Sequence, residues 1–191
     1  MRNGLKSRAG RAASLFLAVL FSAVWLSAAG GIRAVRVAAG PEINGRLDDS
    51  AWAAAPAVSA FRMVEPASDA DPSERTELRV VYDENALYIG ILCFDGEPGR
   101  IVGNTMAHDN TGASSSGGGF GGGYGHGSTA PGDDLVRVLL DPFQDKRTAY
   151  IFFVNPRGAR GEGLVYAGSA SLNWDGIWTA AARIREDGWS A

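Results

Sequence analysis

The sequence predicts an all-β fold, a β-sandwich of immunoglobulin-like or jelly-roll type. Short apolar or alternating segments recur along the chain, separated by glycine, proline, asparagine and aspartate, and no long amphipathic helix interrupts them. Apolar residues make up 46% of the chain, which is enough for a packed core. The core must hold the fold alone, because Cys93 is the only cysteine and no intrachain disulfide can form.

The first part of the domain is expected to enter as a strand and then form one helical turn. Residues 34–39 alternate weakly, and Pro41–Gly45 has the residues of a turn. Asp48-Asp49-Ser50 offers an N-cap to a helical turn over residues 51–55, which contains Trp52 as an expected core residue. A short strand is expected over residues 61–64.

The strongest strand signal is a hairpin in the middle of the chain. Residues 76–83 alternate along two faces, and Glu84-Asn85 forms the turn. Residues 86–94 are almost continuously apolar, which predicts a second strand buried on both faces. Cys93 lies in that run, where a buried thiol without reactivity is expected.

Four further strands are predicted in the second half of the chain, each ended by turn residues. The last of them turns at Glu186-Asp187-Gly188 and restarts at Trp189. The predicted strands cover residues 134–141, 148–154, 162–167 and 178–185.

The first 29 residues are predicted to be a signal peptide. A basic start is followed by an apolar run over residues 14–26 and then by small residues, with Ala29 as the expected cleavage site. The alternative is a membrane anchor, but the run falls short of the ~20 residues of a spanning helix. We therefore expect an exported protein whose residues 30–191 form one domain.

The charge of the expected mature chain limits its partners. The signal holds four of the 18 basic residues and none of the 21 acidic ones, which leaves 14 basic against 21 acidic residues. This acidic balance argues against nucleic acid and anionic membranes as partners and is compatible with sugars or cations.

The residues for catalysis are sparse. His108 and His126 are the only histidines, and no nucleophile-elbow or zinc-protease motif occurs. Adjacent carboxylates such as Asp133-Asp134 point to opposite faces of a strand, so they do not form a glycosidase pair. We interpret these acids as solvated loop ends or strand caps, with a cation site as the alternative.

Residues 112–132 are dominated by glycine and serine and are read as a flexible insert between two strands. Two interpretations stay open for this segment. It is either an adaptable loop that contacts a ligand through Phe120, Tyr124 and His126, or a loop without specific function.

The tryptophans near the C-terminal end are the best clue to function. Trp174 and Trp178 flank a tight turn, with Asn173 and Asp175 beside them. Indole rings offer a flat face to the C–H groups of a sugar, and amides and carboxylates bind its hydroxyls. The alternative is that these tryptophans fill the core. Arg147 is likewise open to two interpretations, a ligand contact or an ion pair with Asp141 or Asp145.

Taken in order, the motifs resemble the family 9 carbohydrate-binding modules. More closely, they resemble the module that begins a group of bacterial exported proteins in which a long outer-membrane barrel-like region follows. The stretches that carry the resemblance are residues 43–52, 73–80, 82–90, 133–141, 147–150, 153–159 and 174–178.

The resemblance implies a β-sandwich that binds glycans without chemistry of its own, with structural calcium in some members. Carried over to this chain, it makes Trp174 and Trp178 the stacking candidates and Asp134, Arg147, Asn155 and Asp175 the polar ones. It also implies a place in the periplasm or outer membrane, or outside a bacterial cell. Two other roles stay open: an interaction domain at the mouth of a barrel without a sugar site, and an accessory domain of a glycoside hydrolase.

Two departures from the resembled pattern stand out. The Gly-rich insert occupies a place where relatives have a short connection. The chain stops at Ala191, whereas further strands follow the Gly-Trp pair in relatives. We therefore expect a C-terminally truncated sandwich.

Overall fold

The computed structural model describes residues 31–63, 69–106, 133–167 and 169–191. The predicted signal peptide, the Gly-rich insert and both histidines lie outside these residues. No helix in the described ranges is long and apolar enough to cross a membrane.

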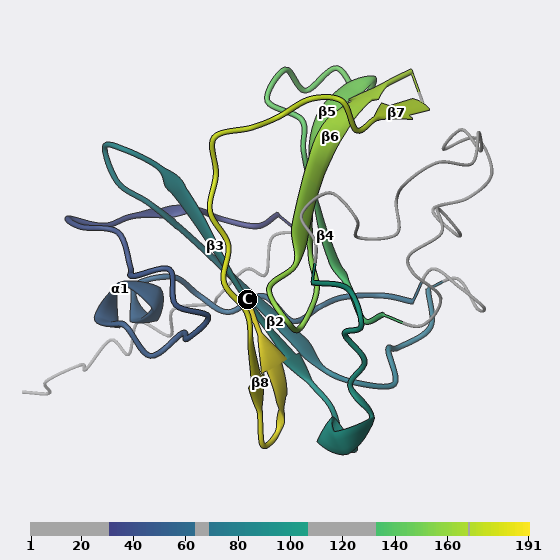
Figure 1. The fold of residues 1–191 in the computed structure, drawn as a ribbon. Helices are drawn as coiled ribbons and strands as arrows, with labels where there is room; N and C mark the ends of the chain where they lie inside the picture. The colour runs from purple at the N-terminus through teal and green to yellow at the C-terminus, as the bar shows by residue number, and fades with distance from the viewer. Residues whose placement is uncertain (1–30, 64–68, 107–132, 168) are drawn as a thin grey trace, which may run out of the picture.

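Two β-sheets make up the described fold, and the predicted all-β class is confirmed (Figure 1). Within both sheets the only parallel pair in the described ranges is β1 with β2. The first sheet has the order β1 (Val35–Arg36), β2 (Thr76–Tyr82), β3 (Leu87–Phe94), β9 (Gly188–Ser190) and β8 (Arg183–Arg185). The second has the order β4 (Val136–Leu140), β5 (Thr148–Val154), β6 (Arg160–Tyr166) and β7 (Ser169–Ser171). The helical elements are α1 (Ser50–Ala53) and a 3-10 turn at Pro98–Arg100.

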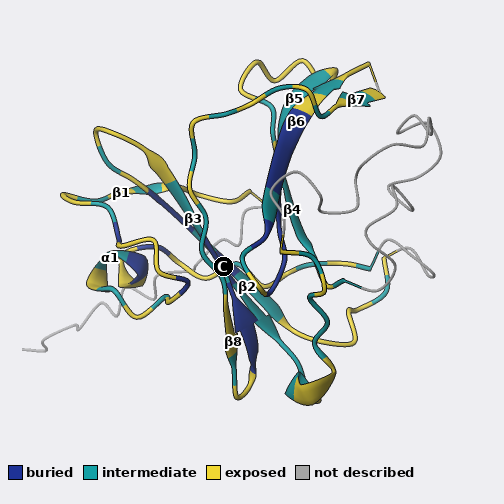
Figure 2. Cartoon of the chain, in the orientation of Figure 1, coloured by how far each residue is buried: buried dark blue, intermediate teal, exposed yellow. Residues whose placement is uncertain are grey.

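The predicted hairpin is β2 and β3, which pair in antiparallel register over their whole length, with Val80 opposite Ile89. One face of this hairpin packs against the second sheet, where Leu78, Val80 and Ile91 form a core with Val136 and Val138. The opposite face of the hairpin has a core of its own, but within β3 only Gly90 and Ile91 are buried, so the predicted burial on both faces is confirmed only in part (Figure 2).

That second core is built around α1. Asp49 caps the helix through its Oδ1, which accepts from the Ala51 N–H at 2.9 Å. The cap directs Trp52 onto the sheet, where the indole is 4% exposed and packs with Ala55 and the fully buried Val81. The prediction of Trp52 as a core residue is confirmed.

Gly90 lets the Trp52 ring approach β3 closely. A Cβ at this position would lie 2.8 Å from Leu47 Cδ2 and 2.9 Å from a ring carbon of Trp52. We expect Gly90→Ala to lower the free energy of unfolding by about 1–3 kcal/mol through overpacking. Urea unfolding measures this, with Gly99→Ala as the control because nothing lies within 4 Å of a Cβ there. Equal effects of the two variants would contradict this packing.

Two predicted strands are wrong in part. Residues 61–63 form no strand, and of residues 178–185 only Arg183–Arg185 pair. Residues 172–182, which we name the crossing segment, run from the second sheet to the first without a partner strand (Figure 1). The exposure of their side chains still alternates from residue to residue. The alternating sequence pattern therefore indicated an extended backbone, but not pairing with another strand.

Candidate functional site

The crossing segment lays its two tryptophans on the inner face of the second sheet. Trp174 contacts Tyr150 of β5, with ring centroids 4.8 Å apart, and lies edge-on to Phe152 at 6.2 Å. Trp178 contacts Phe152 at 4.9 Å, also edge-on. We call Tyr150, Phe152, Trp174 and Trp178 the aromatic strip. Its rings adopt the tilted and edge-to-face arrangements that aromatic pairs prefer.

Strand alternation explains why these rings share one face. Tyr150, Phe152 and Val154 lie on one side of β5, opposite Leu140, Val138 and Val136 of β4. Val136 and Val138 contact the core of the first sheet, so this side faces inward.

Two charged residues of β6 share this inner face. Arg160 and Glu162 are paired with Val154 and Phe152 of β5. The Arg160 guanidinium lies 5.5 Å from the ring centroid of Trp178, and Glu162 Oε1 accepts from the Gly176 N–H at 3.3 Å. Glu162 is only 3% exposed, and its hydrogen bond to Gly176 holds the turn between the two tryptophans against β6.

The tryptophan rings are held by packing. Both are half-buried, and a Cβ at Gly176 would come within 2.7 Å of the Trp174 ring. The Trp178 Nε1 is buried and has no hydrogen-bond acceptor among the described residues. Ring contacts and the neighbouring guanidinium therefore position Trp178, rather than its indole N–H.

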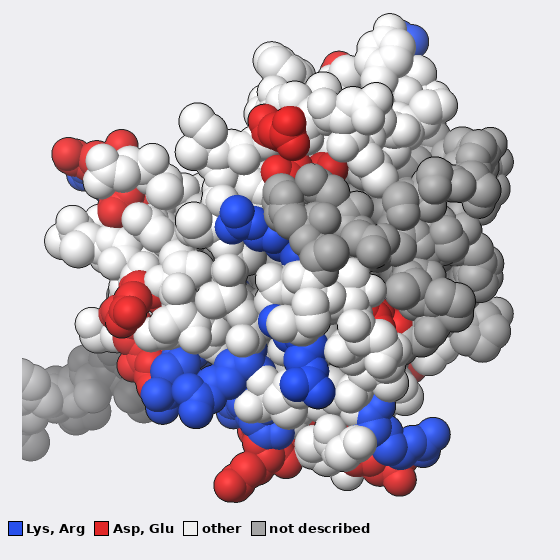
Figure 3. Space-filling model, in the orientation of Figure 1, with Lys and Arg blue, Asp and Glu red and all other residues white. Residues whose placement is uncertain are grey.

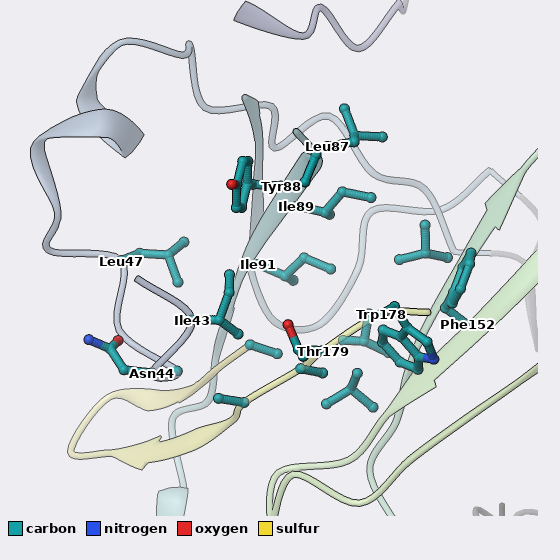
Figure 4. Close-up of a pocket in the computed structure, with 18 of the residues that line it drawn as sticks. Ile43, Asn44, Leu47, Leu87, Tyr88, Ile89, Ile91, Phe152, Trp178 and Thr179 are labelled. Carbon is teal, nitrogen blue, oxygen red and sulfur yellow. The ribbon is translucent and has the colours of Figure 1, made fainter. Parts of the chain in front are cut away.

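An open cavity of about 600 Å³ lies between the two sheets, beside Trp178 (Figure 4). One wall comes from β3, including Ile89 and Ile91, and the opposite wall includes Phe152 and Trp178. The lining is mostly aliphatic, and the volume falls in the range of small-molecule sites.

A second hollow of about 350 Å³ lies at the Tyr150 end of the aromatic strip. Its rim carries Phe143 and Tyr166, whose side chains are 72% and 64% exposed. The second sheet therefore presents aromatic rings to solvent beyond the crossing segment.

The sequence-predicted polar candidates fall in three places. Asp175 is exposed and lies between the two tryptophans, so the structure brings these three together. Asp134 and Asn155 lie at one end of the β4–β5 pair, and Arg147 lies at the other end of β5. Because β5 spans seven residues, about 20 Å at ~3.3 Å per residue, Arg147 and Asn155 do not converge on one small ligand.

Asn155 has a structural role. It is 1% exposed, and its Nδ2 donates to the Thr105 carbonyl at 2.8 Å and to Asp133 Oδ2 at 3.2 Å. Its Oδ1 accepts from the backbone N–H groups of Arg157 and Ala159. The amide thus fixes the turn after β5.

The acidic pairs cap loops, as predicted. Asp134 Oδ2 accepts from the Val102 N–H at 2.8 Å, and Asp145 accepts from the Thr148 hydroxyl and from the Arg147 and Thr148 N–H groups. The Arg147 backbone is further held by the Ala167 N–H, which donates to its carbonyl. In the described ranges no three His, Cys, Asp or Glu side chains gather to hold a metal ion.

Asp133 makes stability depend on pH. Burial raises its pKa, but hydrogen bonds from Asn104, Thr105 and Asn155 outweigh this and hold the pKa below the ordinary 3.8. Since the folded pKa is depressed, the stabilisation is complete above pH ~5 and is lost as the pH falls through the folded value. We expect urea stability to fall between pH ~5 and ~2 less steeply in Asp133→Asn than in the parent chain. Identical slopes would contradict this role.

Cys93 is half-buried, so the expected full burial of its thiol is confirmed only in part. Burial raises its pKa to about 11, so the thiolate is scarce at neutral pH.

Sequence reasoning missed the residues beneath the tryptophans. These residues are Tyr150 and Phe152 of β5 and Arg160 and Glu162 of β6. The register of β5 with β6 places the two charged residues beside the aromatic ones, and the sequence does not specify that register. The available signal was the alternation of Arg160 and Glu162 on one strand, which places both charges on the same face.

Comparisons with known proteins found one similar structure. No protein-family model matches the chain, and no curated protein matches it. The chain is similar to the solved structure of a family 9 carbohydrate-binding module from Caldicellulosiruptor kristjanssonii in complex with cellotriose. The TM-score is 0.48 with 14% identity, over 83% of this chain and 64% of that one, so the chain spans less than two thirds of that structure.

Proposed function

We propose that this chain is a carbohydrate-binding domain that holds a glycan at the aromatic strip and does not cleave it. The observation that carries the proposal is the pair of half-buried indoles on one sheet face, with charged groups beside them. Rings of this kind offer apolar faces to a sugar, while a few polar groups fix its orientation.

The polar groups next to the tryptophans are of the kinds that sugar hydroxyls need. Asp175 is exposed between the two rings and accepts hydrogen bonds, whereas Arg160 beside Trp178 donates them. The ordered motifs that resemble family 9 modules support the same class of ligand.

The surface charge supports a neutral ligand. Figure 3 shows side chains of both signs on the face that carries the crossing segment, with basic ones gathered around β8, which supplies Arg183 and Arg185. Arg185 is engaged with Asp187 at 2.8 Å. A polyanion such as nucleic acid would need a larger uncompensated basic surface.

A glycan array followed by calorimetry tests the proposal. The folded chain should bind at least one soluble oligosaccharide, and chromatography after incubation should recover that oligosaccharide uncut. Trp174→Ala should abolish the measurable heat, whereas Tyr82→Ala, an exposed aromatic of the first sheet, should leave it unchanged. Absence of binding to every glycan by folded protein would refute the function.

We also propose that the protein is exported to the bacterial envelope, on the strength of residues 1–29. Expression in a bacterium with an outer membrane should give periplasmic or outer-membrane protein whose mass corresponds to cleavage after Ala29. Uncleaved protein confined to the cytoplasm would contradict this location.

A further inference from the structure

We propose that the glycan site continues past Trp174 into the hollow at Phe143 and Tyr166, and that its ligand is an extended neutral oligosaccharide and not a single sugar or a disaccharide. This inference rests on the proposed function and deepens it, because one site would contact several consecutive sugar rings. Phe143 and Tyr166 would be the stacking residues at its far end.

The first observation is that the hollow and the aromatic strip share a ring. Tyr150 contacts Trp174, with ring centroids 4.8 Å apart, and also lines the hollow of about 350 Å³ together with Phe143, Leu164 and Tyr166. Leu164 is paired with Tyr150, and Tyr166 lies two residues further along β6, so these three side chains share one face of the sheet. Aromatic and apolar side chains therefore continue from the crossing segment to the end of β6.

The second observation is that this end of the path is open to solvent. Phe143, Leu164 and Tyr166 are all exposed, although each carries a large apolar surface (Figure 2). Large apolar side chains that gather around a hollow and remain exposed mark a binding surface. The crossing segment covers Tyr150 but not these three residues, so ring faces are left accessible beside it.

The strands beneath the hollow have their neighbours in place. Tyr150 is paired with both β4 and β6, and Leu164 and Tyr166 are each paired with both β5 and β7. The hollow is therefore formed by side chains above a complete part of the sheet, and not by an unpaired strand edge. A polypeptide that binds by adding a strand has no free backbone groups to pair with at these positions.

The loop that carries Phe143 is fixed by hydrogen bonds. The carboxylate of Asp141 accepts from the backbone N–H groups of Asp145 and Lys146, at 3.4 and 2.9 Å. Gln144 and Lys146 have φ angles of +54° and +55°, which residues other than glycine seldom adopt. Such backbone outliers gather at ligand sites, where the surrounding bonds keep them in place. The loop therefore presents Phe143 to solvent with little backbone freedom left to lose on binding.

The chemistry of the lining selects the occupant. No charged side chain lines the hollow, which favours a neutral ligand, and the hydroxyls of Tyr150 and Tyr166 can both donate and accept hydrogen bonds. An alkyl chain is stabilised by enclosure, whereas a sugar stacks on an open ring face and keeps most of its hydroxyls in water. The exposed rings of Phe143 and Tyr166 offer open faces. Because they continue the aromatic strip, the same glycan chain is the occupant that fits both.

The length of the path sets the size of the ligand. Tyr166 is paired with Thr148 at one end of β5, and Trp178 contacts Phe152 further along the same strand. From Thr148 to Phe152 the strand advances about 13 Å at ~3.3 Å per residue. This span is longer than one sugar ring, so a ligand that reaches both ends must be a chain of several sugars.

Calorimetry with cello-, xylo-, manno- and maltooligosaccharides, from disaccharide to hexasaccharide, tests the inference. In at least one series the hexasaccharide should bind at least about tenfold more tightly than the disaccharide. Phe143→Ala should remove most of this gain, and it should stay folded because Phe143 is 72% exposed. Tyr82→Ala, which removes an exposed ring from the first sheet, should keep the gain.

The outcomes separate this inference from the proposed function. Equal affinities for disaccharide and hexasaccharide would overturn the extended site and leave glycan binding standing. So would a length dependence that Phe143→Ala leaves intact, or binding on the glycan array without binding in any of the four series. A folded chain that binds no glycan on the array would overturn both.

Two further variants test whether the ring at Tyr166 stacks on the ligand. Tyr166→Ala should lower hexasaccharide affinity by about fivefold to tenfold, whereas Tyr166→Phe keeps the ring and should restore most of it. Equal losses in the two variants would contradict stacking at this position. Sedimentation of the parent chain gives the last check: a dimer that Phe143→Ala dissociates would identify a second copy as the occupant and overturn the inference.

Discussion

Replacing Trp52 by alanine lowers the free energy of unfolding by about 3–5 kcal/mol, a large part of the ~5–15 kcal/mol typical of a domain. The indole is 4% exposed and fills the space between α1 and the outer face of the first sheet, against Val81 and Ala55. Its removal leaves a cavity under a helix of only four residues, which has little stability of its own.

Urea or thermal unfolding measures this loss, with Phe143→Ala as the control. Phe143 is 72% exposed, so its truncation should change stability by less than about 0.5 kcal/mol. Similar losses in the two variants would contradict a core centred on Trp52. The Gly90→Ala variant perturbs the same core from the other side, so the two substitutions should be non-additive.

Replacing Trp178 by alanine should strongly weaken glycan binding while the chain stays folded. Trp178 contacts Phe152 and the Arg160 guanidinium and also lines the cavity between the sheets. Truncation removes one stacking surface and the ring that contacts Arg160. We therefore expect affinity for the glycan to fall tenfold to hundredfold, which is about 1.4–2.7 kcal/mol of binding free energy.

Trp178→Phe separates stacking from general disruption. A phenyl ring restores part of the flat surface, so its affinity should lie between those of the parent chain and Trp178→Ala. Calorimetry with the bound oligosaccharide measures all three, and circular dichroism verifies the fold. Parent-like affinity in Trp178→Ala would remove Trp178 from the site.

Local patterns were enough to predict the strands but not their partners. The run of residues 148–154, ended by turn residues, predicted the bounds of β5, and the Glu84-Asn85 turn predicted the β2–β3 hairpin. The pairing of β9 with β3 joins segments about a hundred residues apart, and no local signal specifies it. The crossing segment misled the prediction because an extended chain without a partner alternates as a strand does.

The candidate site was predicted in part for the same reason. Trp174, Asp175 and Trp178 are close in sequence and stay together in the structure. Arg160 and Glu162 join them only through the register of β6, and Asn155 proves to hold a turn through contacts with residues up to 50 positions away. The sequence could predict which site residues lie close together along the chain, but not which residues the pairing of strands brings together.

The indole N–H signals in an NMR titration with a bound oligosaccharide test the glycan proposal most directly. Trp174 and Trp178 belong to the aromatic strip, whereas Trp52 and Trp189 are 4% and 5% exposed. We expect saturable shifts of the Trp174 and Trp178 signals, with those of Trp52 and Trp189 unmoved. A bound glycan that leaves the Trp174 and Trp178 signals in place would contradict it.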